Sequence, residues 1–385
     1  MKKLLSTSAI LGALAISASS ANAANLQVNV GGFLDFQAGY TSDDIVGDSS
    51  VATDNDDNKI NFNNDTEVQF TVEGKGDNGL EYGAVVELEA DINAGDQAGD
   101  GGANADKTYL FVQGGWGRAE LGGNTDSSEA LSVNTSRFAS ATGGVDGDFY
   151  RYLSANNPGG TNAFIVSPDL PIAEAGVGAT GATANDEDAT KVTYYTPRFS
   201  GFQAGVSYIP NSQATGVAAI NETGYENVWT GGVNYSGEFS GVGVKAAITG
   251  QTGDAKDQTV IAEDLSAWDA GLNVSFSGFT VGGSYGDWTD SLGTNTDAEY
   301  YDIGAGYASG PFSVSVTYLN SDVDAGVAGT DDDEFDNLSV GADYQLAPGL
   351  VPYIEASFFD FDSNGTGVAN DNDGTVVLVG TELTF

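Results

Sequence analysis

Apolar side chains recur at every second position along most of the chain after residue 24. In the first such segment Leu34, Phe36 and Tyr40 fall on one face, while Asp35 and Gln37 fall on the other. A period of two residues is that of a half-buried β-strand. After residue 24 no comparable stretch shows the 3.6-residue period of a helix. The pattern predicts an all-β protein.

The same alternation predicts sixteen strands, separated by connections that are alternately short and long. The predicted strands cover residues 26–40, 60–75, 80–91, 107–114, 117–123, 190–197, 201–209, 226–236, 240–250, 267–277, 278–288, 298–308, 310–320, 334–345, 350–361 and 374–385. An even number of strands in this rhythm is typical of an up-and-down meander, with turns at one end and loops at the other. Residues 161–166 could form a further strand, but an odd count would break the rhythm. We therefore assign them to one long loop at about 124–189.

The two faces of the predicted strands differ in charge. The apolar face carries no Asp, Glu, Lys or Arg, and aromatic residues gather near its two ends. The opposite face is rich in Gly, Ser, Thr, Asn, Gln and Glu, which suits water rather than a packed core. A charge at the middle of a lipid-facing barrel surface costs about 2–4 kcal/mol, and an open sheet edge in hydrocarbon leaves backbone groups unpaired. We therefore expect a transmembrane 16-stranded antiparallel up-and-down β-barrel that is wide enough to enclose an aqueous channel.

Composition narrows the chemistry that this chain can perform. Its 385 residues include 55 acidic and 12 basic ones, for a net charge of −43, and no His or Cys. Their absence excludes Ser-His-Asp and Cys-His nucleophiles, imidazole and thiolate metal sites, and disulfides. The acidity argues against nucleic acid as a partner, because phosphate binding requires clustered Lys and Arg. We expect a protein that is not an enzyme.

Residues 1–23 have the features of a cleaved secretory signal peptide. Lys2 and Lys3 precede an apolar run at 9–16, and Ala21-Asn22-Ala23 supplies the small residues of a cleavage site. The apolar run is far shorter than the roughly 20 residues that a membrane-spanning helix needs. We expect export through the periplasm, with residues 24–385 forming a single barrel domain.

Three segments of the chain stand out as motifs: TKVTYYTPRFSGFQAGVSY at 190–208, WGRAELGGNTD at 116–126 and the C-terminal GTVVLVGTELTF, which ends in Phe385. They resemble segments of the general porins of Gram-negative outer membranes, especially the alphaproteobacterial kind. The resemblance implies a passive diffusion channel for ions and small hydrophilic solutes, present as a homotrimer among outer-membrane lipid and lipopolysaccharide. It also implies that Phe385 is a membrane-insertion signal, and that the long third loop folds into the pore and narrows it.

The first part of the 124–189 loop is predicted to form the pore constriction. Its charged members are Asp126, Glu129, Asp146, Asp148, Arg137 and Arg151. The charged residues predicted for the pore wall are Glu67, Glu81, Glu87, Glu89, Arg118, Glu120, Lys191 and Lys245. Resembling porins set an acidic loop against wall arginines, whereas this inward face is predicted to hold three basic residues against twelve acidic ones. Carboxylate rings concentrate cations, so we expect a cation-preferring pore, although each loop acid could equally be a solvated surface charge.

Acidic runs outside the predicted strands raise the question of a bound metal. Asp54 and Asp56, with Asp57 between Asp56 and Asn58, partly match the start of a Ca²⁺-binding loop, but Lys59 occupies the position that requires Gly. We therefore expect no cofactor, with a structural Ca²⁺ at these loop acids as the alternative.

Two other functions remain open from the sequence. A channel selective for a sugar or a cation would be favoured by an aromatic track along the long loop, and the sequence shows none. A secreted β-rich adhesin or surface protein is disfavoured by the charge-free apolar face and by the terminal Phe385.

Overall fold

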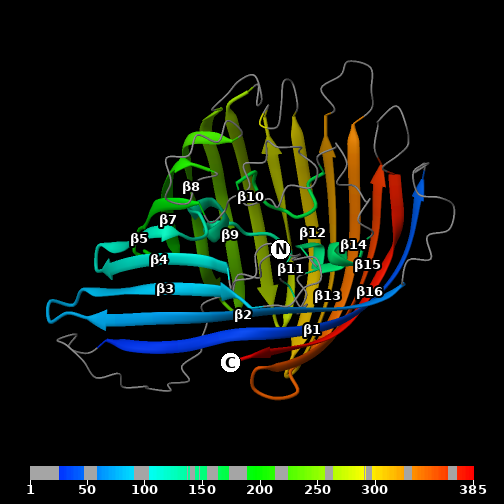
Figure 1. Cartoon of the computed structure of the whole chain (residues 1–385), viewed down its shortest axis with the longest axis horizontal. Coiled ribbons are helices and arrows are strands. Elements are labelled where there is room, and N and C mark those ends of the chain that lie inside the picture. The colour runs from blue at the N-terminus through cyan, green and yellow to red at the C-terminus, as the bar shows by residue number, and fades with distance from the viewer. Residues whose placement is uncertain are drawn as a thin grey trace.

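Sixteen antiparallel strands close into a barrel in the computed structural model (Figure 1). It describes residues 26–46, 59–90, 104–136, 138, 144–146, 148–153, 164–172, 189–212, 224–255, 263–289, 291, 297–324, 332–362 and 371–385. The strands are β1 (Gln27–Val46), β2 (Ile60–Lys75), β3 (Glu81–Glu89), β4 (Asn104–Gly114), β5 (Gly117–Gly123), β6 (Thr190–Tyr195), β7 (Phe202–Asn211), β8 (Tyr225–Phe239), β9 (Val242–Ala255), β10 (Leu265–Phe276), β11 (Phe279–Trp288), β12 (Ala298–Ser309), β13 (Phe312–Val323), β14 (Asp333–Tyr344), β15 (Leu350–Asp362) and β16 (Asp371–Thr384). The prediction of an all-β, 16-stranded up-and-down barrel is confirmed.

Every strand pairs with its neighbours in chain order, and β1 pairs with β16 to close the sheet. At this seam Phe33 lies opposite Thr384. Beyond it the backbones of Gly32 and Phe385 exchange two hydrogen bonds of 3.0 and 3.1 Å. The closed order therefore leaves no strand with an unpaired edge, which is the condition for a sheet in hydrocarbon.

Three of the tight turns repeat one short sequence. Ser-Gly pairs at 200–201, 240–241 and 277–278 connect β6 to β7, β8 to β9 and β10 to β11, and all six residues have positive φ. Two central residues with φ > 0 define the turn type whose twist matches a β-hairpin. Gly adopts this conformation without strain, so these pairs fix the register of the hairpins at this end of the barrel.

The two faces of each strand differ as the alternation predicts. On β1 the side chains of Leu34, Phe36 and Tyr40 are 44–49% exposed, whereas Asp35 and Gln37 are fully buried. Because the sheet is closed, the exposed apolar face is the outer surface and the buried polar face is the interior. The same division continues round the barrel, so that the outer surface is apolar and the charges lie inside.

Aromatic side chains gather on the outer surface near both ends of the strands. At the turn ends Phe279 packs against Tyr307 with ring centroids 4.5 Å apart. At the loop ends Tyr208 packs against Trp229 with a separation of 4.8 Å. Two such belts are what the two membrane–water interfaces favour.

The interior is less uniformly polar than the alternation predicts. A buried hydrophobic cluster joins the long connection after β5 to the inner faces of the last strands. In it Phe149 lies 6.4 Å from Phe335 and 5.8 Å from Phe359, and Phe164 lies 5.2 Å from Phe361, all between ring centroids. The expectation that the whole inward face suits water is therefore wrong for this part of the wall, because the connection covers it.

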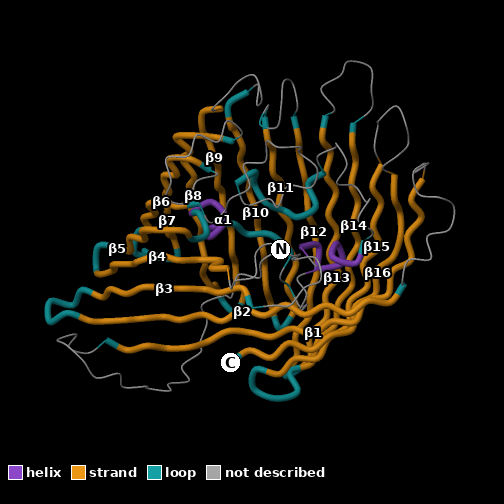
Figure 2. The backbone as a smooth tube through the Cα atoms, viewed as in Figure 1, coloured by secondary structure: helices purple, strands orange, loops and turns teal. Residues whose placement is uncertain are grey.

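The connection after β5 contains three short helical elements, shown in purple in Figure 2. They are α1 (Ser127–Leu131) and the 3₁₀ turns η1 (Gly144–Asp146) and η2 (Asp148–Tyr152). Of the segment 161–166, which sequence assigned to the loop, residues 164–166 belong to none of the sixteen strands and are buried in the hydrophobic cluster. The predicted signal peptide, residues 1–23, lies outside the described residues.

Candidate pore constriction

The long connection begins with α1 packed on the inner face of the wall. Asp126 caps this helix, with its Oδ1 accepting a hydrogen bond from the Ser128 N–H at 2.7 Å. The N–H of Ser127 donates to Ser207 Oγ on β7 at 2.9 Å, and its hydroxyl donates to the Thr230 carbonyl on β8 at 3.0 Å. Because both wall residues belong to the buried face, the helix lies against the interior of the barrel.

Two buried carboxylates hold the next part of the connection. The N–H of Thr135 donates to Asp302 Oδ1 on β12 at 2.7 Å, and the N–H of Gly144 donates to Glu355 Oε2 on β15 at 3.2 Å. Neither acid is more than 1% exposed. Because hydrogen bonds to charged groups contribute about 1.5–3 kcal/mol each, these two acids anchor the connection to the wall.

Glycine on the inner face leaves room for the same segment. A Cβ atom at Gly271 on β10 would overlap the carbonyl oxygen of Val133. One at Gly304 on β12 would lie 3.0 Å from the Thr135 side chain. Glycine at these two positions therefore allows the connection to approach the wall closely.

The turn η2 reaches the first two strands of the barrel. Arg151 forms an ion pair of 3.2 Å with Asp65 on β2. The Tyr152 hydroxyl donates to Gln37 Oε1 at 3.2 Å, and the Thr41 hydroxyl donates to the Tyr152 carbonyl at 3.0 Å. These contacts attach the connection to the side of the barrel opposite its starting point.

Residues 164–172 return along the other strands. Ser321 on β13 donates to the Ile165 carbonyl at 2.7 Å, and the N–H of Ile172 donates to Gln251 Oε1 on β9 at 3.0 Å. Taken together, the described parts of the connection contact the inner face from β7 round to β15 and on to β1 and β2.

The wall formed by β2 to β6 contains a bulge. Glu87 on β3 pairs with Lys107 on β4, but the next residue, Leu88, pairs with Ala105. Asp106 is thus the extra residue of a β-bulge, and both Asp106 and Lys107 are buried. Lys107 Nζ lies 3.3 Å from Glu87 Oε1 and 3.0 Å from Asp106 Oδ2.

Two further basic residues of this wall are occupied by protein partners. Arg118 pairs with Glu120 on the same strand, and its guanidinium lies 4.1 Å over the Phe111 ring. Lys191 donates to the carbonyl oxygen of Asn124. Their positive charges are therefore partly compensated before any solute arrives.

A cavity of about 320 Å³ separates this wall from α1. The charged residues that line it are Glu87, Lys107, Arg118 and Glu120 from the wall, and α1 contributes Ala130 and Leu131. The cavity is the part of the described lumen that charged wall residues and the long connection share.

The structure locates the sequence-predicted site residues as follows. Of the loop set, Asp126 is the buried cap of α1, Glu129 lies within α1, and Arg151 pairs with the wall. Asp146 and Asp148 belong to η1 and η2, but their side chains, and Arg137 entirely, lie outside what is described. Of the wall set, Glu67, Glu87, Glu120 and Lys191 are buried, Glu81, Glu89 and Arg118 are half-buried, and Lys245 is exposed. The Ca²⁺ alternative at Asp54, Asp56 and Asp57 also lies outside the described residues.

Sequence reasoning missed four buried charged residues, Asp65, Asp106, Lys107 and Asp333. Lys107 follows from the alternation of the predicted strand 107–114. Asp106 and Asp333 each lie one residue before a predicted strand, and the bulge adds Asp106 to the same face as Lys107. Asp65 was overlooked although it lies two residues before Glu67 on the same strand face. Continuing the alternation of β2 by one more step would have found it.

Acidic side chains dominate the interior. Among the described residues, eleven Asp and Glu side chains are buried, against two Lys side chains and no Arg. Burial of unpaired charge is unfavourable, so this excess of negative charge requires hydrogen-bond donors or counter-ions. The inner side of the barrel is therefore electronegative.

A closed antiparallel barrel with an apolar, aromatic-belted exterior and a charged interior defines a transmembrane β-barrel channel. No helix among the described residues is long and apolar enough to cross a membrane. The family model for Gram-negative porins matches residues 7–364, and the chain belongs to that family. Family and fold together identify a general outer-membrane diffusion channel rather than an enzyme.

Individual relatives and solved structures are similar to this chain over nearly its whole length. Proteins of Rickettsia conorii and Rickettsia felis that carry no functional description are each 26% identical to this chain over the full length of both. An anion-selective porin from Comamonas acidovorans has a TM-score of 0.64 at 18% identity, covering 94% of this chain and 100% of its own. A Rh. blastica porin variant has a TM-score of 0.57 at 16% identity, covering 93% and 100%. At these identities the structural likeness concerns the fold alone.

Proposed function

We propose that this porin is a water-filled, passive and cation-preferring channel for ions and small hydrophilic solutes. The observation that carries the proposal is the excess of buried carboxylates over buried ammonium groups in the interior. Carboxylates that line a pore raise the local concentration of cations and lower that of anions. The two buried lysines and Arg118 already have acceptors within the protein, which reduces their attraction for passing anions.

We further propose that the long connection narrows the lumen. This proposal is supported by the hydrogen bonds and the ion pair that attach the connection to the inner faces of β7, β12, β15 and β2. Its aromatic residues Phe149 and Phe164 are buried in the hydrophobic cluster, so they offer no stacking surface to a sugar. This favours general diffusion over a sugar-selective channel.

Assembly and location complete the proposal. The chain would be exported through the periplasm with residues 1–23 removed, and would form a homotrimer surrounded by lipid and lipopolysaccharide. The apolar outer surface, with Leu110, Leu121 and Val192 each about half exposed on the short strands β4 to β6, suits contact with lipid or with a second copy. Stepwise conductance in threes, together with the mass of the refolded particle, tests the trimer.

Ion selectivity is tested by the reversal potential of the refolded protein in a planar bilayer under a KCl gradient. We expect the sign of cation preference, and a smaller value at higher salt because ions screen the wall charges. The double variant Glu87→Gln/Glu120→Gln should reduce the preference. The matched control Asp343→Asn/Glu382→Gln, which changes two carboxylates near the turn end, should reduce it less. Anion preference in the unmodified protein would overturn the proposal, and the Comamonas porin provides the reference for that result.

A further inference from the structure

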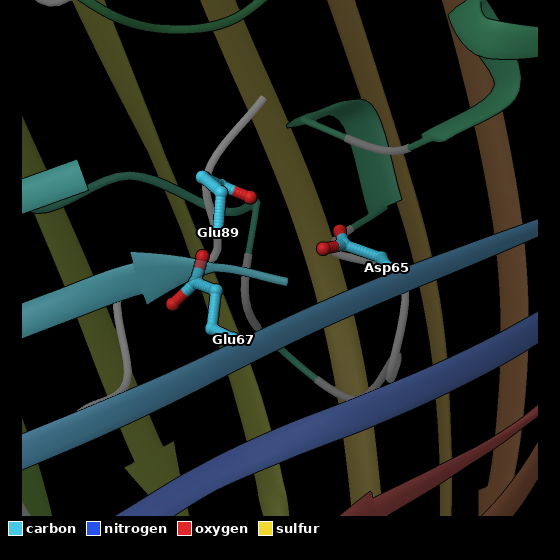
Figure 3. Close-up of side chains that lie close together, drawn as sticks. All are labelled: Asp65, Glu67 and Glu89. Carbon is cyan, nitrogen blue, oxygen red and sulfur yellow. The ribbon is translucent and has the colours of Figure 1, made fainter. Parts of the chain in front are cut away.

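Five carboxylates converge on the inner wall where β2, β3 and β4 meet. Asp65, Glu67 and Glu89 form one group and Glu67, Glu87 and Asp106 a second, and within each group one oxygen from every residue lies within 4.8 Å of the others. Figure 3 shows the first group, with Glu89 above Glu67 in this view and Asp65 across from them, its carboxylate turned toward the pair. Glu67 belongs to both groups and is therefore the centre of the cluster.

The strand register forces these like charges together. Glu67 lies directly opposite Glu89 in the pairing of β2 with β3, and like charges at opposed positions destabilise a sheet. The bulge in β4 then adds Asp106 to the same face. Within the described residues, the ion pairs to this cluster come from Arg151, which contacts Asp65, and from Lys107, which contacts Glu87 and Asp106. These ion pairs contact Asp65, Glu87 and Asp106, and none of them contacts Glu67.

The central side chain shows where positive charge is lacking. Glu67 is 2% exposed, and its Oε2 has no hydrogen-bond partner among the described residues. A buried carboxylate oxygen is normally hydrogen-bonded or coordinated to a cation. Lys107 and Arg151 are already engaged with the other acids of the cluster, so neither is the partner of this oxygen.

We propose that the cluster centred on Glu67 binds a divalent metal cation of the Ca²⁺ type. Carboxylate oxygens are the ligands that Ca²⁺ prefers, at distances of about 2.3–2.6 Å, so two oxygens on one ion are separated by up to about 5 Å. The spread of the cluster oxygens matches this span. Glu67 and Glu89 supply ligands from two adjacent strands, Asp65 or Asp106 supplies a third, and water from the lumen completes the coordination.

An occupied site would change the pore as well as the wall. Glu87 of the cluster lines the cavity beside α1, so a bound divalent ion removes two negative charges from the lumen next to the constriction. The bound ion also stabilises the negative charge of Asp65, whose ion pair with Arg151 holds the η2 turn. Calcium therefore weakens the preference for monovalent cations. This second consequence rests on the proposed function, whereas the binding itself does not.

Binding is measured on the full refolded protein in detergent, treated with EDTA and then dialysed against radioactive Ca²⁺. Glu67→Gln removes the central ligand. Glu81→Gln is the matched control, because it deletes one wall carboxylate that pairs with Lys75 at 2.6 Å outside the cluster. We expect the unmodified protein and Glu81→Gln to bind one more Ca²⁺ ion per chain than Glu67→Gln. This difference is independent of any ion held by other acids of the chain.

Equal binding by Glu67→Gln and Glu81→Gln overturns the proposal. So does a lack of binding in all three proteins, which would mean that a proton shared among the carboxylates compensates the charge. Glu89→Gln gives a second test of the same ligand set if Glu67→Gln does not refold. Reversal potentials separate the two proposals: loss of binding in Glu67→Gln with anion preference throughout retains the metal site and refutes the cation-preferring pore.

Discussion

The two acids that accept backbone hydrogen bonds from the long connection offer a direct test of how it is held. In the double variant Asp302→Ala/Glu355→Ala the N–H groups of Thr135 and Gly144 lose acceptors at 2.7 and 3.2 Å. Each bond to a charged acceptor contributes about 1.5–3 kcal/mol, so local opening of this segment becomes easier by about 3–6 kcal/mol. Since about 1.4 kcal/mol corresponds to a factor of ten, the open population rises by roughly two orders of magnitude or more.

Limited trypsin digestion of the folded barrel measures this population, because the connection contains Arg137 and Arg151. When reclosing is fast, cleavage follows the equilibrium fraction of the open form. Mass spectrometry should show faster cleavage at these sites while the barrel keeps its compact form on unheated gels. The control Asp343→Ala/Glu382→Ala changes the same charge near the turn end. If both double variants are cleaved at rates within threefold of each other, the two carboxylates are not anchors of the connection.

Three further predictions concern the wall, the fit of the connection and the C-terminus. Arg118→Gln should raise the cation-to-anion permeability ratio by up to about 30-fold, since a unit charge at 4 Å contributes about 1 kcal/mol in water and acts in opposite directions on cations and anions; an unchanged reversal potential would contradict this. Gly271→Val should overlap Val133 and lower the temperature at which the folded form is lost on gels, at a cost of about 1–3 kcal/mol. Gly115→Ala, which adds a Cβ in open space, should leave that temperature unchanged. Phe385→Ala keeps the backbone bonds that close the barrel, so it should refold normally in detergent but accumulate unassembled in cells, as fractionation would show.

The barrel could be predicted from sequence because its outer surface meets a single environment. Each outward residue of a strand faces lipid or another apolar surface, so one rule governs Leu34, Phe36 and every later position on that face. The predicted strand boundaries lie close to the observed ones, and the strands predicted at 60–75 and 117–123 have the same bounds in the structure. The three Ser-Gly turns, which the sequence analysis did not use, have positive φ at both residues.

The interior could not be predicted equally well because it meets two environments. Where the connection covers the wall, inward positions such as Phe335 and Phe361 are apolar and pack on Phe149 and Phe164 respectively. Other inward positions are charged. Which environment an inward position meets depends on the path of residues 124–189. The sequence of this connection has no hydrophobic periodicity from which that path could be predicted. The bulge at Asp106 is a second departure from regular alternation. One extra residue turns a charged side chain to the inward face without changing the hydrophobic pattern around it.

The count of interior acids overstates the negative electrostatic potential that acts on an ion in the pore, because many of these acids have structural partners. Asp302 and Glu355 hold the connection. In the cavity beside α1, Glu87 and Glu120 are balanced by Lys107 and Arg118. Near the constriction, Glu67 keeps a buried oxygen without a hydrogen-bond partner among the described residues, at the centre of five converging carboxylates. It follows that cation preference and calcium binding depend on the same residues, and that the selectivity of this porin should vary with the divalent cations around it.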